Sequence, residues 1–276
     1  MSPAASSFTT ELGFRGFFGD APGHGDIQPF LCAPGTDVAL SSALLTLADN
    51  DLGAAITRAN LPFVSFTSTL SVALVARPAL GRFVSFTMVL HNGGTMATGE
   101  VRFADAGGAC FALAHGTFVR SPNPQDVLTS LDPSAMPCGD RLTRPLAERC
   151  GCRVTAPGEA VVELRPDLLN AGGFLHGGVH AILAETAVLS LDADRHRDQR
   201  GQPGVAVDLA VHYLRSARRG PFRAVAEPVG VPAGLRRYRV EVVDLGRDGR
   251  VTSIVTVTCA DLDTLPSVAQ KQQTLR

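Results

Sequence analysis

The chain has 276 residues, enough for one large domain or two of ordinary size, and its 45% apolar content is sufficient to fill a core. Its 25 basic and 26 acidic residues give a net charge of −1, which favours no nucleic-acid partner. The absence of tryptophan also weakens any base-stacking interpretation.

The start of the chain, residues 1–12, is polar and lacks the basic start and apolar run of a signal peptide. No segment reaches the roughly 18 apolar residues of a membrane helix. We therefore expect a cytoplasmic protein with no membrane partner, in which the cysteines are thiols. Cys150 and Cys152 have no second pair at zinc spacing, so we predict neither a metal site nor a cofactor.

The first half opens on a Gly- and Pro-rich stretch, 19–35, that shows no clear period. Leucines at helical spacing then predict a helix over 38–55. Segments with strand character follow at 83–90, 100–104 and 111–119, with glycine turns between them.

A polar, Pro-rich segment, 121–144, has the composition of a linker. The second half then predicts two short strands around Pro157-Gly158 and a helix over 177–191. Alternating apolar residues predict four further strands, at 205–214, 222–229, 237–244 and 250–260.

The two halves form an internal repeat. Sliding the first half by 139 positions places Leu70 on Leu209, Val72 on Val211 and Gly81 on Gly220, with strands and turns in the same order. We predict two units, 1–120 and 145–276, joined by the linker. The expected fold class is α+β, with two antiparallel sheets, each wrapped around a central helix and paired as an intramolecular pseudo-dimer.

The sharpest local pattern runs from Asn170 through His176-Gly177-Gly178 to Glu185. The glycines allow a ligand to approach the start of a helix, where unpaired amides and the helix dipole stabilise an oxygen that gains negative charge. Glu185 lies about 12 Å further along that helix. We expect burial to raise the pKa of Glu185, which suits a base.

This spacing resembles the PaaI-like hotdog thioesterases, clearly over 150–262 and more faintly over the first half. The resemblance implies a double hotdog that hydrolyses an acyl-CoA thioester to a free acid and CoA. It also implies that Asn170 and the amide of Gly177 polarise the carbonyl. Glu185 would then be the nucleophile or general base, and His176 would orient Asn170.

Sites of this family lie between two units, and one hydroxyl often comes from the partner's strand after the helix. That position is Ala206 in the second half but Thr67 in the first. Sliding back by 136 positions from the motif retains only the acid, as Asp49, which we interpret as vestigial or structural. We therefore predict one working catalytic site, made of Asn170, His176, Gly177, Glu185 and Thr67, and a degenerate site in the first half.

Further substrate contacts are expected from Gly178 and Ser68. Arg215 and Arg218 are candidates for binding CoA phosphates, although an ordinary charged loop explains them equally well. Two other functions stay open: a non-catalytic acyl-CoA-binding or interaction module, and an acyl-thioester hydratase or dehydratase. A homo-oligomer of pseudo-dimers is also compatible with the pattern.

Overall fold

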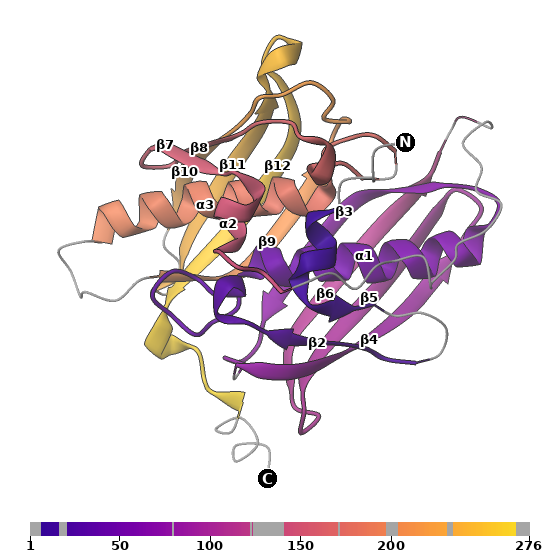
Figure 1. Cartoon of the computed structure of the whole chain (residues 1–276), viewed down its shortest axis with the longest axis horizontal. Helices are drawn as coiled ribbons and strands as arrows, with labels where there is room; N and C mark the ends of the chain where they lie inside the picture. The colour runs from indigo at the N-terminus through magenta and orange to yellow at the C-terminus, as the bar shows by residue number, and fades with distance from the viewer. Residues whose placement is uncertain are drawn as a thin grey trace.

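The computed structural model describes residues 7–16, 21–78, 80–121, 123, 141–170, 172–196, 204–230 and 234–268. Two long helices, α1 (Ser41–Asn60) and α3 (Gly177–His196), lie side by side against the same face of one curved sheet (Figure 1). Each helix buries an apolar stripe against its own half of the sheet. No helix in the described part of the chain is long and apolar enough to cross a membrane.

The sheet has 12 strands, joined antiparallel in the order β1-β2-β4-β5-β6-β3-β9-β12-β11-β10-β8-β7. The strands are β1 (Phe14–Arg15), β2 (Gly23–Ile27), β3 (Ser65–Leu74), β4 (Gly81–Asn92), β5 (Met96–Asp105), β6 (Cys110–Arg120), β7 (Arg153–Ala156), β8 (Glu159–Val162), β9 (Gly204–Tyr213), β10 (Phe222–Gly230), β11 (Arg236–Asp244) and β12 (Arg250–Asp261). The short helices are η1 (Phe8–Leu12), η2 (Pro29–Leu31), α2 (Leu146–Cys150), η4 (Pro166–Leu168), η6 (Leu245–Arg247) and η7 (Leu262–Thr264).

The predicted helices and strands are present, with ends that differ by a few residues. We expected two paired sheets; in the structure β3 and β9 hydrogen-bond to each other, so both halves form one continuous sheet. In this pairing Leu70 faces Val211, Val72 faces Leu209, and Ser71 faces Ala210 at the centre. This pairing covers one edge of each half, from Thr69 to Ala73 and from Asp208 to His212.

The Gly- and Pro-rich stretch near the start contains strand β2, which sequence periodicity did not reveal. Gly23 and Gly25 of this strand sit against aromatic rings: a Cβ at Gly25 would lie 2.8 Å from the Phe83 ring. Glycine is therefore required here for close packing rather than for a turn. The predicted linker, 121–144, lies mostly outside the described residues.

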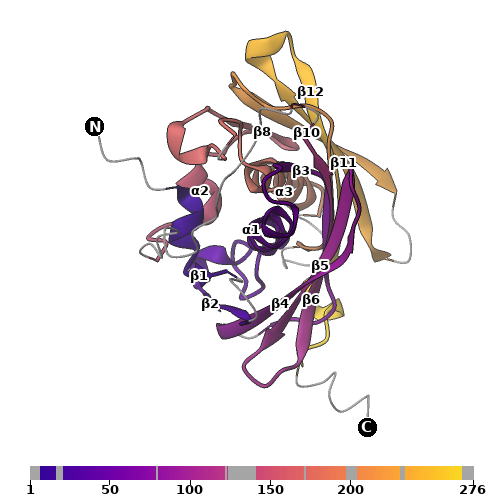
Figure 2. The ribbon, with the colours of Figure 1, turned by 90° about the vertical axis from the view of Figure 1, so that its right-hand side faces the viewer.

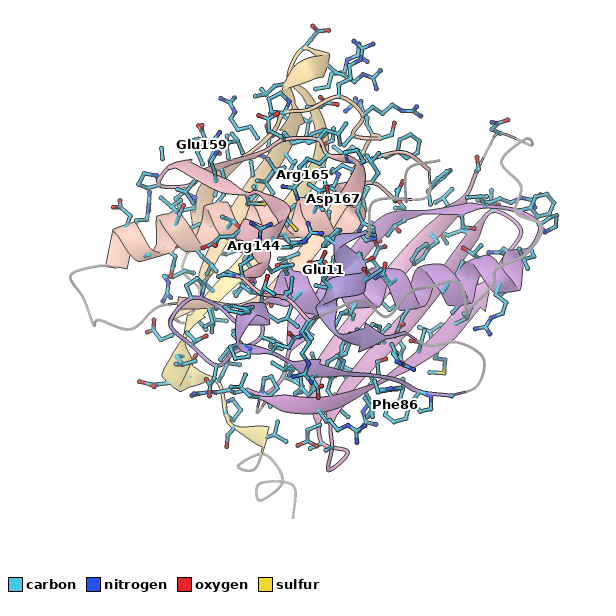
Figure 3. All side chains as sticks on the ribbon, viewed as in Figure 1. Glu11, Phe86, Arg144, Glu159, Arg165 and Asp167 are labelled. Carbon is cyan, nitrogen blue, oxygen red and sulfur yellow. The ribbon has the colours of Figure 1, made fainter. Side chains whose placement is uncertain are left out.

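A third layer covers the helices on the side away from the sheet, where Figure 2 shows α2 beside the N-terminal segment. Glu11 of η1 accepts two hydrogen bonds from Arg149 of α2, at 2.5 and 2.6 Å. Arg149 also pairs with Asp167 at 2.6 Å, and Figure 3 shows Glu11 close to Asp167 and Arg165. Phe8 packs edge-on against the ring of His176, 5.4 Å between centroids, so this layer reaches the start of α3.

Candidate active site

The chain enters α3 through a tight hairpin. The carbonyl of Leu168 accepts the amide of His176 at 2.8 Å, and the amide of Asn170 donates to the carbonyl of Phe174 at 2.8 Å. The side-chain oxygen of Asn170 accepts the amides of Gly172 and Phe174, at 3.0 and 3.1 Å. The carboxamide is thereby held in place, and its Nδ2 group has no hydrogen-bond partner among the described residues.

The first turn of α3 offers one free amide. The amide of Gly178 donates to His176 Nδ1 at 3.0 Å, and a Cβ at Gly178 would overlap the Thr46 hydroxyl on α1. Gly178 is therefore a close-packing position, and its amide is not available to the substrate contact that we predicted. The amide of Gly177 has no acceptor within the described part of the chain, and Gly177 is partly exposed.

His176 is a neutral, oriented ring. Its Nδ1 accepts the Gly178 amide, so the ring proton lies on Nε2, which faces Asn50 Oδ1 at 3.2 Å. Burial lowers the pKa of the His176 imidazole, and the nearby Asp49 carboxylate only partly offsets that effect. The expected contact of His176 with Asn170 is therefore corrected: its side-chain partner is Asn50, on α1.

The carboxylate at the start of α3 comes from α1. Asp49 Oδ1 accepts the Thr67 hydroxyl at 2.8 Å, and Asp49 Oδ2 lies 3.9 Å from His176 Nδ1. A Cβ at Gly177 would lie only 2.7 Å from Asp49 Oδ2. The Asp49 side chain is 11% exposed, so this carboxylate, unlike that of Glu185, is not sealed from solvent.

Glu185, our expected base, faces the start of the other helix. Its Oε1 and Oε2 accept the amides of Ser41 and Ser42, the first residues of α1, at 3.1 and 2.9 Å. The side chain is sealed, with the residue 1% exposed, and burial raises the pKa of Glu185 to about 7 despite these hydrogen bonds. The prediction of a raised pKa is confirmed. Glu185 lies eight residues beyond Gly177 on α3, and its carboxylate binds the start of α1 instead of facing the start of α3.

Thr67 lies on β3, and its side-chain partner is Asp49 of α1, not Glu185, with which we expected it to form a site. A bulge between Thr67 and Thr69 shifts the register of β3 against β6 and leaves Ser68 as the extra residue. The hydroxyl of Thr67 reaches Asp49, whereas Ser68 makes no side-chain hydrogen bond within the described residues. Nothing in the arrangement brings Ser68 to the substrate position that we predicted.

The two arginines differ in their placement. The Arg218 guanidinium lies over the Phe174 ring, 4.1 Å from its centroid, at the tip of the hairpin that carries Asn170. Phe66 of β3 flanks the same ring at 6.2 Å, so residues of both halves meet there. The Arg215 guanidinium instead donates to the carbonyl of Val251 at 3.0 Å on the exposed surface.

Two residues of this region escaped the sequence patterns. Asn50 follows Asp49 and could have been noted only by its position. Tyr213 ends β9, and its hydroxyl lies 2.8 Å from the Cβ position of Gly177. No group of three or more His, Cys, Asp or Glu side chains in the described residues is arranged to hold a metal ion.

Comparison of the sequence with known proteins identifies a family. Residues 172–249 match the family model described as the thioesterase superfamily. The chain is 30% identical over 106 residues to the Bacillus subtilis (strain 168) protein named "Putative esterase ComA2", covering 38% of this chain and 77% of that protein. The chain belongs to the thioesterase superfamily.

Solved structures show the fold that this superfamily member adopts. A protein of unknown function with a hot dog fold, from Alicyclobacillus acidocaldarius, superposes with a TM-score of 0.60 at 13% identity, covering 92% of this chain and 97% of its own. The acyl-CoA thioesterase II TesB2 from Mycobacterium marinum gives a TM-score of 0.58 at 13% identity, covering 94% and 98%. The fold is therefore a hotdog fold.

Proposed function

We propose that this chain is an acyl-CoA thioesterase of the PaaI-like kind, which hydrolyses an acyl-CoA thioester to a free acid and CoA. One observation carries the proposal. A partly exposed carboxylate, Asp49, lies against a helix start whose first amide, that of Gly177, has no acceptor among the described residues. The superfamily supports a thioester hydrolase, and this site supplies groups suited to that reaction.

The start of α3 would hold the carbonyl oxygen of the thioester. The Gly177 amide and Asn170 Nδ2 are donors without partners in the described residues, and Asn170 is fixed by the two amides bound to its oxygen. The positive end of the helix dipole adds to this field. Donors of this type, fixed before the substrate arrives, each typically contribute about 3 kcal/mol to stabilising an oxyanion.

Asp49 would be the base or nucleophile in place of Glu185. The Thr67 hydroxyl holds Oδ1 and turns Oδ2 toward Gly177. As a base, Asp49 removes a proton from water while the water oxygen bonds to the carbonyl carbon. The tetrahedral intermediate then breaks its C–S bond, and the Asp49 carboxyl returns the proton to the departing thiolate.

Glu185 cannot serve the same role without first being released. Each of its carboxylate oxygens accepts a hydrogen bond from a backbone amide, and only 1% of the residue is exposed. We infer that it closes the degenerate site, at the start of α1. The two helices are related by the repeat: Ser41 and Gly177 begin them, and Asp49 and Glu185 each follow eight residues later.

The β3–β9 register supports reading the chain as a double hotdog. Pairs such as Leu70 with Val211 and Val72 with Leu209 are what a two-fold axis through Ser71 and Ala210 produces under the 139-residue repeat. In this interpretation the chain is a fused pseudo-dimer whose working site takes residues from both units. Arg218 would meet CoA phosphates beside the hairpin, and Arg215 is the weaker candidate, since a backbone carbonyl already binds its guanidinium.

A hydratase or dehydratase is disfavoured by the state of His176. An acid–base histidine needs a ring nitrogen that can exchange a proton with the substrate. Here Nδ1 accepts the Gly178 amide and Nε2 is bound to Asn50. The non-catalytic module has no specific observation in its favour.

The test is release of free thiol from a panel of acyl-CoAs, with Asn170→Asp as the diagnostic variant. This change keeps the oxygen that binds the Gly172 and Phe174 amides but replaces the Nδ2 donor by a second oxygen. We expect wild-type turnover on at least one substrate and a loss of about 10²–10³-fold in kcat for the variant, the effect typical of one oxyanion donor. Binding of acyl-CoA without thiol release by the wild type would overturn hydrolysis and support the module.

A further inference from the structure

The outer face of the first half of the sheet exposes apolar side chains on three neighbouring strands. On β4, Ser85 and Thr87 point inward, since both donate hydrogen bonds to Asp51 of α1, so Phe86 and Met88 point outward. Figure 2 shows both long helices on the opposite side of the sheet, and Figure 3 labels Phe86 on β4. The exposed apolar residues of this face, which we call the outer patch, are Phe86, Met88, Met96, Leu113 and Val119, each between 40% and 52% exposed.

Two opposite charges lie within the outer patch, both on β5. Glu100 stands opposite Met88 of β4, and Arg102 stands between Phe86 of β4 and Leu113 of β6. Glu100 forms no ion pair and no side-chain hydrogen bond within the described residues. Arg102 makes one side-chain hydrogen bond in the same part of the chain, a long one of 3.3 Å to a backbone carbonyl. Both charges are therefore available to a partner.

The equivalent face of the second half pairs its charges within its own surface. Under the 139-residue repeat, Glu100 and Arg102 correspond to Arg239 and Glu241, which form a 2.6 Å ion pair along β11. Glu227 stands where the first half has a methionine, and it faces Arg239 on the next strand. Opposite charges across neighbouring strands stabilise an exposed sheet surface. Because the two halves share one framework, the outer patch is not a consequence of the fold.

The charge pattern of the outer patch is complementary to itself. When two copies face each other across a two-fold axis that crosses β5 at Val101, Glu100 of each copy lies over Arg102 of the other. The same rotation places Phe86 over Met88, because these residues stand level with Arg102 and Glu100. Packed sheets lie about 10 Å apart, a gap that a glutamate and an arginine span together. The hydrocarbon of a lipid surface would instead leave both charges unpaired, which is costly.

We propose that the outer patch is the surface through which two copies of this chain form a dimer. The two sheets pack face to face, with two Glu100–Arg102 ion pairs inside a ring of apolar side chains. Contiguous exposed apolar surface of this kind marks interaction sites in proteins. The start of α3 lies on the other side of the sheet and stays uncovered, so this inference is independent of the proposed function.

The experiment measures molar mass in solution by sedimentation velocity on the full chain. The wild type should have about twice the mass of one chain, 28.9 kDa. Glu100→Arg and Arg102→Glu each bring like charges together at two points of the interface. We expect each to raise the dissociation constant at least about 100-fold and to sediment as a monomer. An equal mixture of the two variants should dimerise again, because every facing pair is then opposite in charge.

Arg239→Glu is the matched control, since it reverses the equivalent charge on the outer face of the second half. This variant should stay dimeric, and all the variants should keep the wild-type melting temperature to within a few degrees. A wild type of 28.9 kDa at every concentration, dimeric single variants, or a mixture that stays monomeric would overturn the proposed dimer. A monomeric wild type that sediments with phosphatidylcholine vesicles would overturn it in favour of a lipid partner.

Discussion

The starts of α1 and α3 occupy equivalent positions in the two halves, but their amides are used differently. At the start of α1, the longer acid Glu185 reaches across and binds the amides of Ser41 and Ser42, in a sealed environment. At the start of α3, the shorter acid Asp49 stops short of Gly177, which stays partly exposed. The two acids differ in length by one methylene. Glu185 binds the amides at the start of α1, whereas we propose that the amide at the start of α3 binds a ligand.

The surroundings reinforce this difference. Thr67 donates to Asp49, but the position that we matched to it, Ala206, has no hydroxyl, and the Ser41 hydroxyl binds the Ala206 carbonyl at 2.8 Å. The same helix and strand framework therefore gives a structural tie at the start of α1 and, in our proposal, the reactive site at the start of α3.

The largest effect is expected from Asp49→Glu, which would give the start of α3 an acid as long as the one that binds the start of α1. The added methylene should let the carboxylate bind the Gly177 amide, as Glu185 binds those of Ser41 and Ser42. We expect kcat to fall by about 10²–10⁴-fold, comparable to losing the base, while the melting temperature holds or rises because a free amide gains a partner. Thiol release measures kcat, and thermal unfolding measures the melting temperature. Near wild-type turnover would contradict the role of side-chain length.

Glu185 should make stability depend on pH. Its pKa is raised to about 7 in the folded chain from an ordinary value of 4.5, so folding favours the protonated form. The stabilisation is complete below about pH 4.5 and is lost as pH rises through about 7, by on the order of 3 kcal/mol. Urea unfolding of wild type and Glu185→Gln at several pH values should show this decline only in the wild type. Parallel curves for the two proteins would refute it.

Thr67→Ala should have the smallest effect, a loss of about tenfold in kcat at unchanged KM, because one hydrogen bond no longer fixes Asp49. The neighbouring Ser68→Ala is the matched control, since Ser68 makes no side-chain hydrogen bond in the described part of the chain. Equal turnover of Thr67→Ala and Ser68→Ala would remove Thr67 from the site.

Much of the framework could be read from the sequence. Apolar spacing located α1 and α3, and alternation with glycine turns located β4–β6 and β9–β12. The strand β2 was missed because its glycines pack closely against Phe14 and Phe83 and leave no apolar alternation to detect. The repeat predicted that the two sheets pair, but their union into one sheet through β3 and β9 follows from an edge contact that no local pattern encodes.

The sequence indicated only those parts of the candidate site that lie close together along the chain. Asn170 and Gly177 share one hairpin and helix start, so their proximity follows from chain order. Which acid meets them depends on how α1 packs across α3, and spacing along a single helix cannot reveal that. The signal was present: Asp49 is the one motif residue that survives the 136-residue slide, and Thr67 follows it on the next strand. Tyr213 left no signal beyond a tyrosine at a strand end.

The most direct test of the account compares Asp49→Asn with Glu185→Gln in one thiol-release assay, on the acyl-CoA that the wild type hydrolyses best. Both changes replace a carboxylate by the amide of the same length. We predict that Asp49→Asn lowers kcat by at least about 10²-fold, as expected for a lost base or nucleophile, and that Glu185→Gln keeps wild-type kcat per folded molecule. Full activity of Asp49→Asn together with an inactive but folded Glu185→Gln would contradict the proposal that the start of α3 is the catalytic site.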